Sequence, residues 1–180
     1  MLTLSKPIAT ILLLGSFIAM SGCGAQLPPQ SEWVSFTTTD GKVTASFPKQ
    51  PTITTQSVDS PIGKLDFVIT MADYGSKAFL INHLTYPVDP SQYDVAVGLN
   101  GAAQGAAQNV QGTLEEDEDI TLLGFPGKSL LVKTPQGLWV RGRICIDPAG
   151  PTLYQIQCVG PQDFVNGSVA KEFLNSLAIN

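Results

Sequence analysis

The chain is poor in the residues from which metal sites and catalytic sites are built. Its 180 residues include one histidine, three cysteines and two tryptophans. A zinc site made of histidine and cysteine therefore lacks ligands. The sequence contains no Gly-x-Ser-x-Gly turn, phosphate-binding loop or dinucleotide fingerprint. We expect no metal, no cofactor and no catalytic residue, and we expect that the protein is not an enzyme.

Charge is also sparse, and basic residues are the minority. The chain has 10 lysines and arginines against 15 aspartates and glutamates, for a net charge of −5. Nucleic-acid recognition depends on basic patches that neutralise phosphates, so this balance argues against nucleic acid as a partner. The same balance gives the body of the protein no electrostatic attraction to anionic lipid.

An apolar segment near the amino end indicates a signal peptide. Lys6 supplies positive charge before the apolar run Ile8–Met20. As a helix this run would reach roughly 20 Å, which is short of the ~30 Å hydrocarbon core of a bilayer. A cleaved signal over residues 1–22 therefore fits better than a permanent membrane span.

The residues that follow, Ser21-Gly22-Cys23, resemble the bacterial lipobox. The resemblance implies that Cys23 receives a diacylglyceryl group, that cleavage occurs before it, and that acyl chains such as palmitate anchor the protein. Two or more chains would hold it stably at a membrane. The alternative is a chance cysteine near an ordinary cleavage site. We expect a lipidated spacer over 23–31 and a single domain over 32–180.

Alternating apolar and polar residues, separated by turn residues, predict a meander of antiparallel strands. Asp40-Gly41 and Phe125-Pro126-Gly127-Lys128 are two of the expected turns. The acid run Glu115–Asp119 lacks the spacing of a calcium loop, so we interpret it as a solvated strand whose charges block edge pairing. The expected strands are Trp33–Thr38, Val43–Phe47, Thr52–Val58, Lys64–Tyr74, Ala78–Tyr86, Leu114–Leu122, Ser129–Thr134, Leu138–Ile146 and Thr152–Val159.

Two segments show helical periodicity instead. The first is Asp89–Val110, with Asp89 as N-cap, Pro90 at the first helical position and Leu99 central in the apolar stripe. Its three glycines would thin one side for close packing on a sheet. The second helix, Pro161–Ser176, can be interrupted at Asn166-Gly167. The fold class is therefore α+β, an antiparallel meander with two main helices packed on it.

The two remaining cysteines, Cys145 and Cys158, are predicted to stay free thiols. A five-residue loop between their strands would pair Ile146 with Thr152. This register separates the two cysteines by ~16 Å along the strands. A disulfide needs Cα atoms within about 7 Å, so the pair cannot bridge.

Trp139, Arg141 and Arg143 should project from one face of the Leu138–Ile146 strand. Tryptophan and arginine are enriched at binding hot spots, so these three residues are the candidate partner-binding site. In an acidic chain they would suit a carboxylate-rich partner. The alternative is internal: the arginines lie under a helix, or reach across the intervening strand to Glu116 or Glu118.

Several short motifs resemble a group of uncharacterised bacterial lipoproteins that share the fold of Mog1, DcrB and PsbP. The motifs are Trp33-x-x-Phe36, Asp40-Gly41-Lys42, Phe47-Pro48-x-x-Pro51, Pro61-Ile62-Gly63, Asn109–Gly112, Leu123–Lys128, Arg141-x-Arg143, Leu153–Gln155 and Phe173–Ser176. The resemblance implies an α/β/α sandwich with binding or assembly roles, at a periplasmic face or in a thylakoid lumen. It carries over no metal or photosystem residue.

These observations favour a membrane-anchored, non-catalytic domain that binds a protein partner outside the cytoplasm. Two other hypotheses stay open. A carboxylate-dependent hydrolase would require a cleft lined by convergent acids with shifted pKa values. A small-ligand carrier would require a deep apolar pocket.

Overall fold

The computed structural model describes residues 26–60 and 62–180. The predicted signal peptide and Cys23 lie outside these residues. Strands make up most of the regular structure, as predicted. They are β1 (Val34–Thr37), β2 (Val43–Phe47), β3 (Thr52–Ser60), β4 (Gly63–Asp73), β5 (Ala78–Thr85), β6 (Thr113–Leu122), β7 (Phe125–Lys133), β8 (Trp139–Asp147), β9 (Thr152–Gly160) and β10 (Ala178–Ile179). The helical elements are η1 (Gln30–Glu32), η2 (Pro90–Gln92), α1 (Val95–Asn109), α2 (Gln162–Asn166) and α3 (Ser168–Asn175).

Within the described residues the strands form two antiparallel sheets. The large sheet has the order β3-β4-β5-β9-β8-β7-β6, and the small sheet the order β1-β2-β10. The predicted meander is thus two meanders, β3-β4-β5 and β6-β7-β8-β9, which join where β9 pairs with β5. The chain is mixed α+β, as its two sequence periods predicted.

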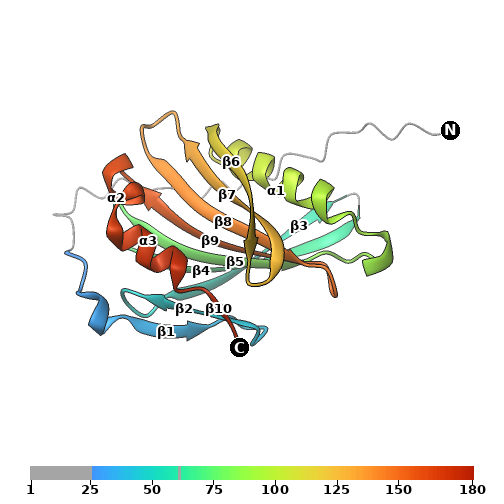
Figure 1. The fold of residues 1–180 in the computed structure, drawn as a ribbon, viewed down its shortest axis with the longest axis horizontal. Coiled ribbons are helices and arrows are strands. Elements are labelled where there is room, and N and C mark those ends of the chain that lie inside the picture. Colours follow the sequence, from blue (N-terminus) through green and yellow to red (C-terminus); the bar gives the residue numbers. More distant parts are fainter. Residues whose placement is uncertain (1–25, 61) are drawn as a thin grey trace.

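The two faces of the large sheet carry different elements (Figure 1). Helix α1 packs on one face, over β6, β7 and β8. Helices α2 and α3 pack on the other face, over β8 and β9, and α3 also contacts β2 of the small sheet. The main core lies on this second face, where Phe47, Phe79 and Phe173 are completely buried.

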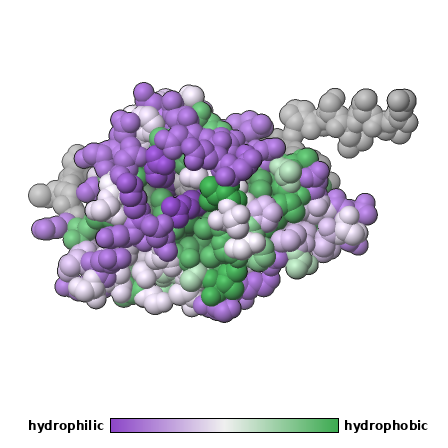
Figure 2. Space-filling model, in the orientation of Figure 1, coloured by the Kyte–Doolittle hydropathy of each residue, from purple (hydrophilic) through white to green (hydrophobic). Residues whose placement is uncertain are grey.

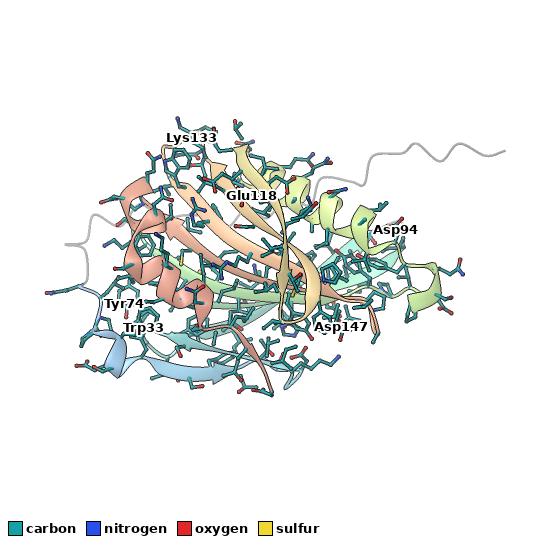
Figure 3. The ribbon with its side chains drawn as sticks, in the orientation of Figure 1. Trp33, Tyr74, Asp94, Glu118, Lys133 and Asp147 are labelled. Atoms are coloured by element: carbon teal, nitrogen blue, oxygen red, sulfur yellow. The ribbon has the colours of Figure 1, made fainter. Side chains whose placement is uncertain are left out.

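Helix α1 begins later than the sequence predicted. Asp89 caps only the short η2 turn, through Ser91 N at 2.8 Å. The chain is then extended at Tyr93, and Asp94 (Figure 3) caps α1 by accepting from Val97 N at 3.0 Å. The break lets the Tyr93 ring stack on Tyr86, with centroids 5.0 Å apart. The central position of Leu99 is confirmed, since it is buried against the sheet.

The predicted turn Phe125-Pro126-Gly127-Lys128 is wrong, because these residues start β7. The chain reverses one step earlier, at Leu123 and Gly124, whose φ angles are 57° and 82°. Gly127 is needed for a different reason: a Cβ there would lie 2.3 Å from the Ile144 carbonyl oxygen. The glycine thus permits β7 and β8 to approach closely.

Three other expectations concern the end of the chain. The carboxy-terminal helix is interrupted at Gly167, as predicted, and divides into α2 and α3. Cys145 and Cys158 are free and buried, also as predicted. The predicted register is off by one residue, because Asp147 rather than Ile146 pairs with Thr152. The loop is one residue shorter than expected, and the strands continue further toward it.

Candidate binding site

Trp139, Arg141 and Arg143 share one face of β8, as strand parity predicted. This face carries α2 and α3. Trp139 lies at the start of β8 and is half-buried against the main core. The Lys133 ammonium lies 5.5 Å from the centre of its ring. The tryptophan therefore packs as part of the scaffold at the end of the strand, while the two arginines lie further along it.

Arg141 is held by two partners from elements on either side of it. Its Nη1 and Nη2 donate to the Glu116 carboxylate at 3.0 and 3.3 Å, across the intervening strand β7. Its Nε and Nη2 donate to Asn166 Oδ1 of α2 at 3.1 and 2.8 Å. These contacts are those of the internal alternative. They fix the guanidinium plane, because a bidentate carboxylate and an amide hold three of its nitrogens.

A β-bulge positions the acid of this pair. The register between β6 and β7 shifts between Leu114 and Glu116, so Glu115 has no partner of its own. Bulges of this kind redirect the side chains that follow them. Here the shift places Glu116 and Glu118 on the arginine face, and Asp117 and Asp119 on the α1 face.

On the opposite face, Lys128 pairs with the two aspartates of the acid run. Lys128 Nζ lies 2.9 Å from Asp117 Oδ1 and 3.0 Å from Asp119 Oδ1. The lysine side chain is largely covered, and its hydrogen bonds to Asp117 and Asp119 raise its pKa. Among the described residues, no group of three histidine, cysteine or acidic side chains is arranged to hold a metal ion.

Arg143 is bound less completely than Arg141. Its Nη1 donates to Asn175 Oδ1 at 2.8 Å and to the Leu174 carbonyl at 3.4 Å, both at the end of α3. No acidic group of residues 26–60 or 62–180 lies within 4.0 Å of its guanidinium nitrogens. Nε and Nη2 make no hydrogen bond within the same residues, so the charge and two donating nitrogens remain available.

A hollow of about 340 Å³ lies between this strand pair and the two short helices. Lys171 of α3 adds a third basic group, and it is exposed with no acidic group within 4.0 Å in the described part of the chain. We name this region the basic hollow. Its lining residues are Ser129, Arg141, Arg143, Asn166, Lys171, Leu174 and Asn175.

The surroundings of the basic hollow are strongly polar. Hydrophilic side chains gather over α2, α3 and the adjoining strands on this side of the molecule (Figure 2). Glu118 lies midway along β6 and Lys133 at the end of β7 (Figure 3), on the same side as the arginines. The hollow can hold an anion through two charged groups and amide donors, while Glu116 and Glu118 form an acidic border along β6.

Sequence reasoning found the two arginines but missed Lys171, Asn166 and Asn175. These residues lie in α2 and α3, more than twenty residues after the arginines, and only the packing of the helices on β8 brings them together. The one available signal was the break at Asn166-Gly167. The break divides this segment into α2 and α3, and each of the two helices contributes one asparagine to the hollow.

A second polar cluster, which sequence reasoning also missed, links the β1–β2 turn to the large sheet. The Tyr154 hydroxyl of β9 donates to Asp40 Oδ2 at 2.7 Å, and the Thr38 hydroxyl donates to Asp40 Oδ1 at 2.6 Å. Burial alone would raise the pKa of Asp40, but these hydrogen bonds and one from Lys42 N outweigh it and lower the pKa. The His83 ring stacks on Tyr154, with centroids 6.2 Å apart.

His83 is buried in this cluster, and its charge state follows from that burial. Desolvation lowers the pKa of His83, and the nearby Asp40 charge only partly offsets the effect. Nε2 lies 3.4 Å from the Thr39 hydroxyl, while Nδ1 is buried without a partner in the described residues. We interpret the cluster as a structural clasp that holds the turn against β9.

No protein-family model matches the chain, and no curated protein matches it. Among solved structures, the chain is similar to LpqN, involved in cell envelope biogenesis of Mycobacterium tuberculosis, at 19% identity with a TM-score of 0.43. The alignment covers 89% of this chain and 87% of LpqN. It is also similar to PA94 of Pseudomonas aeruginosa, a protein of unknown function, at 14% identity and a TM-score of 0.34. That alignment covers 74% of this chain and 85% of PA94. At these values neither similarity transfers a role to a residue.

Proposed function

We propose that the protein is a lipid-anchored extracytoplasmic domain that binds an acidic segment of a protein partner in the basic hollow, without catalysing a reaction. The observation that carries this proposal is the pair Arg143 and Lys171. Both face the hollow, and neither has an acidic group within 4.0 Å among the described residues. A carboxylate-bearing segment would supply the missing negative charge.

The two arginines have different roles in this proposal. Arg141 is already paired with Glu116 and Asn166, so it supports the wall of the hollow. Arg143 still has Nε and Nη2 to offer, and a planar guanidinium suits carboxylate recognition. We therefore place the binding contacts on Arg143 and Lys171, and treat Arg141 as a residue that positions the site. Trp139 is not among the lining residues and belongs to the scaffold.

The lining also bears on the alternative functions. A carboxylate-dependent hydrolase needs convergent acids, and a small-ligand carrier needs a deep apolar pocket. The basic hollow offers charged and amide groups with a single apolar residue, Leu174. This composition favours anion binding over either alternative.

Two finer parts of the proposal concern the membrane anchor and the fold. The apolar run before Cys23 supports lipidation at that residue, and among the described residues no helix has the length and apolar character needed to span a bilayer. Helices on both faces of the large sheet support an α/β/α sandwich of the Mog1 and PsbP kind. Inhibition of the lipoprotein signal peptidase should leave a heavier, uncut precursor. A mature chain that starts elsewhere than Cys23 would contradict the anchor.

The binding site is tested by charge reversal and crosslinking at the native membrane. Arg143→Glu and Lys171→Glu should each stay folded, with little change in Tm, and lose the crosslinked partner. Lys64→Glu is the matched control, since Lys64 is exposed on β4, the charge change is the same, and the variant should keep the partner. If both hollow variants retain the partner, or if they lose it only because they melt early, the proposed site is wrong.

A further inference from the structure

The large sheet ends in two edges that differ in their protection against pairing. The β6 edge carries the acid run Glu115–Asp119 and a β-bulge. Acidic side chains and bulges both discourage a second strand from adding to an edge. If two β6 strands met, acids would oppose acids along the middle of the strand. This edge is therefore built to remain unpaired.

The β3 edge has neither a run of acids nor a bulge. It is Thr52–Ser60, and all nine residues pair with β4 in continuous register. Its sequence, TITTQSVDS, has no proline and no basic residue, and Asp59 is its one charge. Most of its side chains are exposed, Ile53 by 46%. Long edges rich in β-branched residues are ready templates for another strand.

The face beside this edge is also incompletely covered. Helix α1 packs on β6, β7 and β8, at the other end of the sheet. On the same face, β4 carries Phe67, Ile69 and Met71, which stay partly exposed. The polar site described above lies on the opposite face, over β8. A strand added to β3 would therefore extend the sheet without blocking the basic hollow.

We propose that β3 is a dimerisation edge, at which two copies of the chain pair their β3 strands antiparallel around Thr55. Centring on Thr55 opposes Thr52 with Val58 of the second copy, Ile53 with Ser57, and Thr54 with Gln56. Asp59 falls outside the paired stretch. Centring on Gln56 would instead oppose Asp59 with Ile53, which removes a charge from water against an apolar side chain.

The choice of a second copy rests on this self-complementarity. In the Thr55-centred register no like charges face each other, and most opposed pairs contain a β-branched residue, which favours strand pairing. The faces of the two sheets also stay continuous, because opposed residues project to the same side. The proposal is independent of the proposed function, since it involves no residue of the basic hollow.

Crosslinking of the full chain in detergent tests the register. In antiparallel strands opposed Cα atoms lie about 4.5–5.5 Å apart, within the range of a disulfide. Thr55→Cys should give a disulfide-linked dimer under mild oxidation. The parent chain is the blank for Cys23 and the two buried cysteines, and Glu118→Cys on β6 is the control for an exposed strand.

A charge swap at the same position separates pairing from chance contact. Thr55→Lys should weaken the dimer about fivefold or more, because the two lysines oppose each other. Thr55→Glu should weaken it equally, and an equimolar mixture of the two should restore a heterodimer. Monomers at every concentration, equal crosslinking through Glu118→Cys, or a Thr55→Cys crosslink to a different protein would each overturn the proposal.

Discussion

The two faces of the large sheet hold their covering elements in different ways. On the α2 and α3 face, Phe79 is fully buried at the centre of an aromatic network. Its ring centroid lies 5.1–6.2 Å from four others in edge-to-face geometry: Trp33, Tyr74, Phe164 and Phe173. Trp33 and Tyr74 lie near each other on the side of the small sheet (Figure 3). On the other face α1 offers mainly alanine and glycine, with Leu99 as its one large buried side chain.

This difference indicates where stability is concentrated. Large aromatic side chains bury more apolar area than alanines, and paired rings add attraction beyond that area. The face that carries the basic hollow is therefore the rigid one. Helix α1 should be the less stable layer, since elements with few buried apolar contacts open at lower free energy.

The largest expected effect is on the aromatic face. Phe79→Ala should lower the free energy of unfolding by about 3–5 kcal/mol, since it removes the ring that the four aromatic neighbours share. Denaturant unfolding followed by fluorescence and circular dichroism measures it. Both signals should shift together. A loss below about 1 kcal/mol would show that this face is not the dominant core.

Leu99→Ala should cost less, about 2–4 kcal/mol, because it removes the main contact between α1 and the sheet. Native-state hydrogen exchange should show faster exchange in α1 and unchanged protection in β9. Val97→Ala is the control, because Val97 is 60% exposed on the same helix. Equal loss of protection in α1 and β9 would contradict the difference between the faces.

Tyr154→Phe removes the hydroxyl that holds the β1–β2 turn through Asp40. It should cost about 1–2 kcal/mol, because the acceptor is charged but remains partly reached by water. Tyr74→Phe is the matched change, since the Tyr74 hydroxyl donates to the neutral Pro48 carbonyl at 3.0 Å. It should cost less than Tyr154→Phe. Denaturant unfolding measures both losses. A larger loss for Tyr74→Phe than for Tyr154→Phe would show that the Tyr154–Asp40 hydrogen bond does not hold the turn.

The same clasp should make stability depend on pH. The pKa of His83 in the folded chain lies below its ordinary value of 6.5. As the pH falls below that value, the unfolded chain binds a proton that the folded chain does not, so the free energy of unfolding decreases. The decrease ends once the pH is below the folded pKa. His83→Gln should flatten this part of the curve of unfolding free energy against pH. An unchanged curve would show that His83 is not the group responsible.

The smallest effects concern the α1 glycines and run in both directions. Gly101→Ala and Gly105→Ala should each stabilise by about 0.4–1 kcal/mol, because the added Cβ meets no atom within 4 Å and alanine favours the helix. Gly98→Ala should destabilise, since its Cβ would lie 2.1 Å from the Tyr93 hydroxyl and 3.1 Å from Ile146 Cδ1. The Tm of each of the three variants measures these effects. A lower Tm for Gly101→Ala or Gly105→Ala would show that Gly98 is not the only one of the three that close packing requires.

Local pattern predicted most of the elements, because each strand alternates and each is bounded by turn residues. The prediction failed where the same residues can adopt more than one local conformation and tertiary contacts select one of them. Asp89-Pro90 is a good helix start by itself, yet the packing of Tyr93 on Tyr86 delays α1 to Val95. Pro126-Gly127 fits a type II turn, yet the close approach of β8 keeps both residues in β7.

Some residues of the candidate site could be predicted from local pattern, and others depend on tertiary contacts. Strand parity placed Arg141 and Arg143 on one face, and the reach across β7 to Glu116 followed from strand spacing. Lys171 could not be found, because no local pattern relates a helix residue to a strand three elements earlier. The clasp of Asp40 with Tyr154 was hidden for the same reason. The β1–β2 turn meets β9 through Asp40 and Tyr154, and the sequence alone does not specify that contact.

The junction of β5 with β9 has a consequence for how the chain must assemble. Ala78 pairs with Val159 and Thr85 with Thr152, so partners at the centre of the large sheet lie far apart along the chain. Phe79 contacts Phe164 and Phe173, which both follow β9 in the chain, and β2 pairs with β10 near the carboxy end. Such distant pairings slow folding, because the chain between them must be ordered before any contact is made. A nascent chain that ends before β9 therefore lacks the strand that joins β5 to β8, and it has no closed core.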